Sequence, residues 1–148
     1  MTLLLAVAAA LFGAGCGETH ADHHAHDHHR AESVPAATFE EARGLQLTPA
    51  ARAFIGLDTA EVARRDFAAA KGAAAVPVAA VLRTVRGDFV YVVTGEWFRR
   101  TPVSVAGSDD TQLAITDGLR AGDRVVIGGV RALWLAEIQA RNSGAHVH

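Results

Sequence analysis

Histidine side chains gather near the two ends of this 148-residue chain. Six lie among acidic residues between positions 18 and 29, and two stand at the C-terminus: His20, His23, His24, His26, His28, His29, His146 and His148. Imidazole is the commonest protein ligand for borderline divalent metals. A histidine pair spaced by one residue in extended backbone places both rings on one side, within reach of one ion. We therefore expect a loose, exchangeable metal site, with a solvated polar tail as the alternative.

The identity of the metal is narrowed by the near absence of sulfur ligands. The chain has one cysteine, Cys16, and one methionine, Met1, which argues against Cu(I) and Ag(I). Imidazole accepts Zn(II), Co(II), Ni(II) and Cu(II), and the sequence does not choose among them. We expect any such metal to be bound loosely and no cofactor to be obligatory.

Enzyme motifs give little support for catalysis. Residues 24–29 resemble the H-x-H-x-D-H ligand motif of binuclear metallohydrolases, but Asp27 falls one residue early and no strand precedes the motif. The chain has no G-x-S-x-G, H-E-x-x-H or Walker sequence. We therefore expect a protein that is not an enzyme. The net charge of −2 also gives no reason to expect nucleic-acid binding.

The first 16 residues have the pattern of an export signal. Residues 3–12 are apolar, and small residues lead from them to Cys16. The run is too short to cross a bilayer but suits a secretory signal. The small residues before a cysteine resemble the lipobox of bacterial lipoproteins, which implies lipidation at Cys16 and a periplasmic, membrane-anchored protein. A core helix is the alternative. Residues 17–38 are then predicted to be a disordered, histidine-rich tether.

The rest of the chain predicts a mainly β domain over residues 39–140, followed by a histidine-containing tail over 141–148. Short strands are expected at 57–67, 76–85, 89–93, 97–106, around 112–115 and at 125–127, each bounded by turn residues. A short helix is expected at 49–55, where Thr48 and Pro49 form a helix start. A second helix after residue 129 would place Val130, Leu133, Trp134 and Ile138 on one face. This spacing favours a small antiparallel barrel or sandwich.

Several motifs resemble the periplasmic adaptor subunits, or membrane fusion proteins, of resistance-nodulation-division (RND) metal-efflux pumps, in their cobalt-zinc-cadmium branch. Residues 76–92 match a "VP..AV…G…V.V" pattern, and residues 118–129 match the more specific "GL..GD.VV..G" signature. Residues 47–62 resemble the segment that begins these proteins. The likeness covers roughly two thirds of the chain.

The resemblance implies a shortened adaptor. In the family, a lipoyl-like domain and a long α-helical hairpin separate the two end segments, whereas here residues 67–75 join them directly and no heptad run exists. The two ends are therefore expected to form one membrane-proximal-like domain. The implied partner is an inner-membrane RND pump or its adaptor. A free-standing periplasmic metal buffer and a decayed gene fragment remain alternatives.

Overall fold

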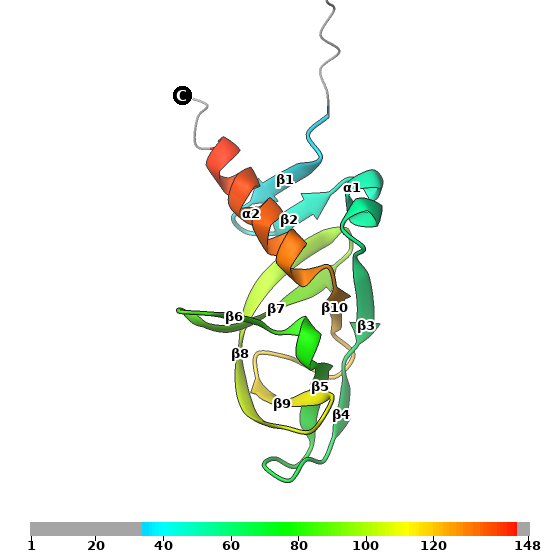
Figure 1. Ribbon diagram of the computed structural model, residues 1–148, viewed down its shortest axis with the longest axis vertical. Helices are drawn as coiled ribbons and strands as arrows, with labels where there is room; N and C mark the ends of the chain where they lie inside the picture. The colour runs from blue at the N-terminus through cyan, green and yellow to red at the C-terminus, as the bar shows by residue number, and fades with distance from the viewer. Residues whose placement is uncertain (1–33, 145–148) are drawn as a thin grey trace, which may run out of the picture. The chain divides into compact units, whose positions relative to one another are not determined.

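The computed structural model describes residues 34–144, which form an antiparallel, mainly β domain with two α-helices (Figure 1). The elements in chain order are β1 (Ala37–Glu40), β2 (Gly44–Leu47), α1 (Pro49–Phe54), β3 (Asp58–Glu61), β4 (Ala63–Arg65), β5 (Ala73–Pro77), a 3₁₀ turn (Val78–Ala80), β6 (Leu82–Thr84), β7 (Gly87–Thr94), β8 (Trp97–Ser108), β9 (Gln112–Asp117), β10 (Arg124–Gly128) and α2 (Val130–Gly144). The expected mainly β fold with a short N-terminal and a C-terminal helix is confirmed.

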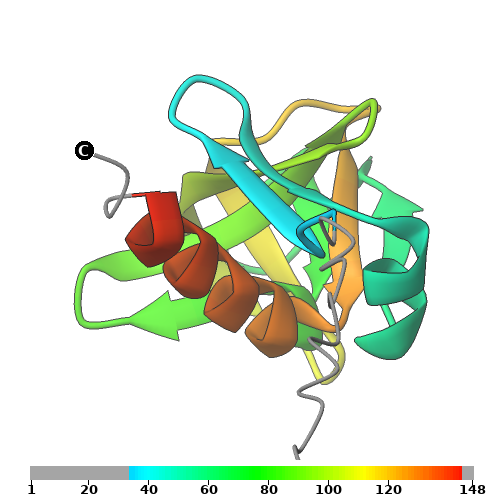
Figure 2. The ribbon, with the colours of Figure 1, turned by 90° about the horizontal axis from the view of Figure 1, so that it is seen from above.

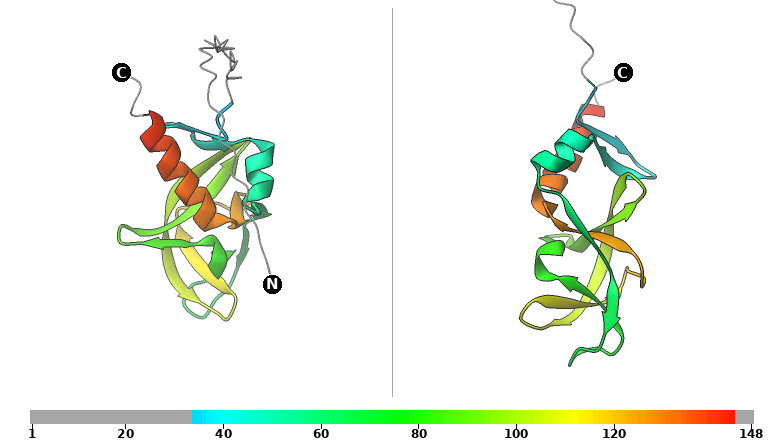
Figure 3. Two further views of the ribbon diagram at one scale, coloured as in Figure 1. Left: turned by 45° about the horizontal axis from the view of Figure 1, so that its top comes forward. Right: turned by 90° about the vertical axis from the view of Figure 1, so that its right-hand side faces the viewer.

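The strands hydrogen-bond in the order β3-β10-β7-β8-β9-β5-β4, with β2 also paired to β8 and β6 to β7. The long strand β8 holds the two halves of this array together. Its first half pairs with β2 and β7, and its second half pairs with β9. Register shifts between Ser104 and Gly107 mark irregularities that bend a strand and increase its twist. Figures 1 and 3 show both α-helices beside β1 and β2 at one end of the strands, with β4, β5 and β9 at the other.

Two main apolar clusters fill the domain. One lies among β5, β7, β9 and β10 and includes Val76, Val90 and Ile115. The other lies beneath α2 and includes Leu45, Tyr91 and Leu133. Because Val125 belongs to the first cluster and Val126 to the second, β10 is buried on both faces.

The N-terminal and C-terminal parts of the domain share one core, as expected. β3 pairs antiparallel with β10, and β4 pairs with β5. Between β3 and β4, the N–H of Val62 donates to the carbonyl oxygen of Asp123 at 2.7 Å, and the Val62 carbonyl accepts from Gly122 at 3.2 Å. The Val62 side chain packs in the same apolar cluster as Val76 and Val90. Residues 67–75 therefore do not separate the two parts of the domain.

The "GL..GD.VV..G" signature has a physical explanation at each described position. Gly118 has φ +95°, and a Cβ atom there would collide with the carbonyl oxygen of Pro102. Leu119 is buried in the first cluster. The Asp123 carboxylate accepts from the backbone N–H of Arg120 at 2.7 Å and so closes the turn. The signature therefore forms the turn that leads into β10, which lies between the two apolar clusters, and this turn is hydrogen-bonded to the backbone of Val62.

Three expectations about the elements are wrong in detail. The strand expected at 76–85 is divided, because β5 occupies Ala73–Pro77, a 3₁₀ turn follows, and β6 begins at Leu82. Ala73, Ala74 and Ala75 are buried strand residues and not a connection, since their small side chains let β5 lie close to β4 and β9. The strand expected at 57–67 breaks where Val62 pairs with the turn before β10.

A fourth correction concerns the buried face of α2. Val130 and Leu133 are buried and Trp134 is half-buried, as expected, but Ile138 is 37% exposed. The buried position on that turn is Glu137, which is 3% exposed. The helix therefore brings a carboxylate, and not a fourth apolar side chain, to its interface with the strands.

Candidate functional site

The residues predicted from the sequence to bind metal or lipid lie outside the described part of the chain. They are His20, His23, His24, His26, His28, His29, His146, His148 and Cys16. Within residues 34–144, no group of three or more His, Cys, Asp or Glu side chains is arranged to hold a metal ion. Over the same residues, no helix is both long enough and apolar enough to span a bilayer. Metal binding by the histidines and lipid attachment at Cys16 therefore stay predictions.

Among residues 34–144, the buried charged side chain is Glu137, which lies between α2 and the strands. One carboxylate oxygen of Glu137 accepts from the Tyr91 hydroxyl at 2.6 Å. The other lies 3.3 Å from Nη2 of Arg100 and 3.1 Å from Nε of Arg141. The Tyr91 bond is a charge-assisted hydrogen bond, which is stronger than a neutral one, and the two arginines form ion pairs with the same carboxylate. Three elements, β7, β8 and α2, are thus joined through one buried carboxylate.

The positions of these side chains follow from strand register and helix spacing. Tyr91 and Arg100 are direct partners in the β7–β8 pairing, so their side chains share the face of the sheet that α2 covers. Glu137 follows Leu133 by one helical turn and therefore points to the same strands. Arg141 is four residues beyond Glu137, within reach of its carboxylate on the helix surface.

Burial raises the pKa of the Tyr91 hydroxyl well above its usual range, and the hydrogen bond to Glu137 raises it further. The two arginines act in the opposite direction without reversing the shift. The hydroxyl therefore stays protonated and continues to donate to the carboxylate.

This arrangement holds the fold together and offers no free chemical group. Both carboxylate oxygens are engaged, and no buried side-chain nitrogen or oxygen within residues 34–144 lacks a hydrogen-bond partner. The sequence analysis misses this group because it assigns only apolar side chains to the buried face of the helix. The sequence does contain a signal, because Glu137 follows Leu133 by four residues and Trp134 by three, and both of those lie on the apolar face.

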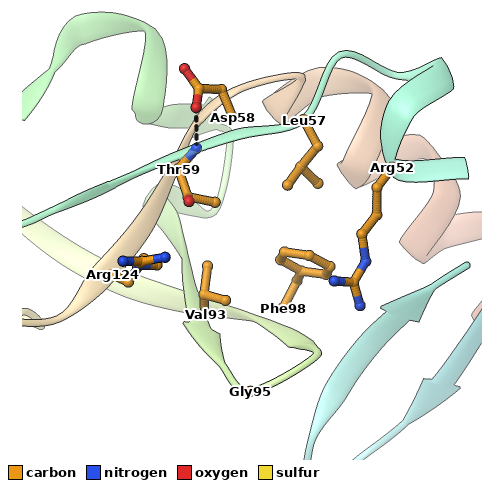
Figure 4. A pocket seen from close by; sticks show the side chains of 8 residues that line it. All are labelled: Arg52, Leu57, Asp58, Thr59, Val93, Gly95, Phe98 and Arg124. Carbon is orange, nitrogen blue, oxygen red and sulfur yellow. Dashed lines mark hydrogen bonds between the residues drawn. The ribbon is translucent and has the colours of Figure 1, made fainter. Parts of the chain in front are cut away.

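A cavity of about 540 Å³ lies between α1, the start of β3 and the β7–β8 turn (Figure 4). Arg52 lies on one side of it, donates to the carbonyl oxygens of Leu47 and Glu96 at 3.1 Å, and places its guanidinium over the ring of Phe98. Asp58 accepts the backbone N–H of Thr59 at 2.7 Å. The cavity wall contains no paired nucleophile and base. Arg52 here fastens α1 to the neighbouring strands.

Comparison with known proteins agrees with the sequence resemblance over part of the chain. Residues 72–132 match the family model described as the C-terminal permuted SH3 domain of RND membrane fusion proteins. No curated protein matches the chain. Among solved structures, a 180-residue portion of SilB from Cupriavidus metallidurans CH34, determined by NMR and holding its N-terminal metal-binding site and membrane proximal domain, matches with 22% identity and a TM-score of 0.44. That match covers 80% of this chain and 79% of the other.

The matched segment runs from the turn before β5 into the first turn of α2 and includes the whole "GL..GD.VV..G" signature. It accounts for less than half of the chain, yet it holds all the strands from β5 to β10. Residues 72–132 of this chain are therefore similar to the C-terminal permuted SH3 domain of RND membrane fusion proteins.

Proposed function

We propose that this chain is a non-enzymatic, adaptor-like accessory of an RND-type heavy-metal efflux system and acts in the bacterial periplasm. The observation that carries the proposal is the match of residues 72–132 to the membrane fusion protein domain. The pairing of β3 with β10 supports it, because the residues before the matched segment complete one fold with it. The proposed partner is the inner-membrane RND pump or its full-length adaptor.

The test is co-purification of the full chain with the RND pump of its host after membrane solubilisation. We expect the pump to be recovered with the chain. A matched control replaces the six histidines between residues 20 and 29 with alanine, which should leave pump association unchanged because docking is assigned to the folded domain. Failure to recover any inner-membrane pump with either chain would contradict the proposal.

The metal-binding part of the proposal rests on the histidine-rich segments. Six histidines within ten residues, with Asp22 and Asp27 among them, give many equivalent ways to surround a divalent ion. We propose that these segments hold Zn(II), Co(II), Ni(II) or Cu(II) and pass the ion to the efflux system. Titration calorimetry with the full chain and the alanine-substituted control measures this directly, and equal heats for both chains would contradict it.

The same histidines support a second function, a free-standing periplasmic metal buffer. In a strain that lacks the pump, deleting residues 20–29 distinguishes the metal-buffer function from the pump-accessory function. A buffer predicts that the deletion raises metal sensitivity in that strain, whereas a pump accessory predicts no further effect.

Membrane attachment through Cys16 is proposed on the lipobox resemblance. Mass spectrometry of the mature protein tests it, since lipidation adds a diacylglyceryl mass that the Cys16→Ser variant lacks. An unmodified Cys16 in the mature protein would contradict attachment through this residue.

A further inference from the structure

The β6–β7 hairpin projects from the domain beside the C-terminal half of α2 (Figure 2). Val85 at its tip is fully exposed, and Arg83 and Arg86 flank it as exposed side chains. The tip is held in shape by Thr84, whose hydroxyl donates to the carbonyl oxygen of Gly87 at 3.1 Å and accepts from the backbone N–H of Arg86 at 3.1 Å. The hairpin therefore presents an apolar side chain between two cations in a defined geometry.

The outer face of α2 repeats this combination of apolar and cationic side chains. Leu135 is 57% exposed and Ile138 is 37% exposed; Leu135 follows Arg131 by four residues, and Ile138 follows Leu135 by three. A cavity of about 800 Å³ separates this face from the hairpin, with Arg86 on one wall and Ile138 on the other. The hairpin and the helix thus form one surface, called the hairpin–helix surface below.

This surface is cationic although the chain as a whole is not. It carries five arginines, at positions 83, 86, 100, 131 and 141, and two carboxylates, Asp88 and Glu137, whereas the chain has a net charge of −2. Glu137 is buried and engaged by Arg100 and Arg141. Asp88 stands opposite Arg83 in the hairpin register. Within residues 34–144, the guanidinium groups of Arg83 and Arg86 make no ion pair or hydrogen bond, which leaves them available to an outside anion.

We propose that the hairpin–helix surface binds the surface of an anionic phospholipid bilayer. Guanidinium groups bind phosphate oxygens in a bidentate way, so Arg83 and Arg86 suit lipid headgroups. Val85 projects beyond them, at the depth where apolar side chains of peripheral proteins enter the acyl boundary. The apolar residue at the projecting tip favours a bilayer over an acidic protein segment, which would place its carboxylates between the arginines and gain nothing from Val85.

The experiment measures partitioning of the full chain, carrying Cys16→Ser to prevent lipid attachment, onto sedimented vesicles. One set of vesicles contains equal parts of phosphatidylglycerol and phosphatidylcholine, and the other contains phosphatidylcholine alone. The test variant is R83Q/R86Q. The matched control is R99Q/R120Q, which removes the same charge from two other exposed positions. Comparing variants in one background subtracts any contribution from the apolar residues 3–12.

On anionic vesicles, R83Q/R86Q should bind about 30-fold more weakly than the parent chain, because each arginine near such a surface contributes about 1 kcal/mol. The control pair should change binding by about twofold or less, since charges beyond a Debye length of about 10 Å are screened. Val85→Asp should also weaken binding to anionic vesicles. On phosphatidylcholine vesicles all four chains should behave alike.

Three results would overturn the proposal. The first is an equal loss for both arginine pairs, which would indicate a nonspecific charge effect. The second is release by inorganic phosphate at constant ionic strength, which would indicate a small-anion site. The third is binding of polyglutamate through Arg83 and Arg86 without any binding to vesicles, which would assign the surface to an acidic protein.

Discussion

Replacing Glu137 with alanine tests whether the buried carboxylate fastens α2 to the strands. The substitution leaves the Tyr91 hydroxyl, in a residue with 0% exposure, without its partner. An unsatisfied buried polar group costs about 1–3 kcal/mol. Arg100 also loses its partner, but its side chain is 24% exposed and regains water. The ion pair with Arg141, whose side chain is 44% exposed, is an i,i+4 pair on the helix and contributes about 0.5 kcal/mol.

These contributions add to a loss of about 1–3 kcal/mol in the free energy of unfolding, after a few tenths are returned by the better helix propensity of alanine. A domain of this size has about 5–15 kcal/mol of stability, so the variant should still fold. The measurement is urea unfolding followed by tryptophan fluorescence, with Trp134 on α2 as a local reporter. The control is Glu40→Ala, whose exposed ion pair with Arg43 should be worth about 0.5 kcal/mol or less.

A double-mutant cycle with Tyr91→Phe isolates the interaction from general damage. Alone, Tyr91→Phe should lower the free energy of unfolding by about 2 kcal/mol, because it removes a hydrogen bond to a charged group. In the Glu137→Ala background it should cost far less, since the hydroxyl there has no partner to lose. Additive effects of the two substitutions would refute the view that Tyr91 and Glu137 act as one unit.

Further predictions concern titration, backbone conformation and chain connectivity. Tyr91 is the chain's only tyrosine, and folding raises its pKa. The protonated Tyr91 therefore stabilises the folded state fully below the ordinary tyrosine pKa of 10.0, and this stabilisation is lost as the pH rises above that value. Tyrosinate absorbance should appear only with unfolding, and titration of Tyr91 in the folded protein would contradict this. Gly118→Ala should lower the free energy of unfolding by about 1–3 kcal/mol because of its positive φ, as measured by urea unfolding. Inserting about ten glycine and serine residues after Lys71 should cost about 1 kcal/mol, whereas the same insertion after Arg120 should cost about 3 kcal/mol or more, because it breaks the turn bonded to Val62. Zn(II) affinity of the histidine segments should fall as the pH drops through about 6.5, and equal calorimetric affinities above and below that pH would contradict their role as ligands.

The strands rich in β-branched and aromatic residues could be predicted from the sequence, whereas the alanine strand could not. Residues 89–93 alternate between the two apolar clusters and carry a strong strand signal. Ala73 to Ala75 carry no such signal, and their strand state depends on pairing with β4 and β9. Long-range pairing of this kind overrides the weak local preference of alanine.

The burial of Glu137 likewise depends on long-range contacts that the local sequence does not reveal. The apolar spacing of Val130, Leu133 and Trp134 predicts which side of α2 faces the strands. It does not predict that Glu137 enters that side, because a buried carboxylate is stable only where partners neutralise it. Those partners, Tyr91 and Arg100, lie far away in the sequence and come together only through the β7–β8 register.

The hydrogen bonds of Val62 show how the residues before the matched segment complete the fold with it. The N-terminal segment could have remained a separate piece, since only residues 72–132 match the family model. Instead β3 and β4 pair with strands inside that segment, and both backbone groups of Val62 are bonded to the turn before β10. The short link from Phe67 to Gly72 therefore joins strands whose partners already hold them in place.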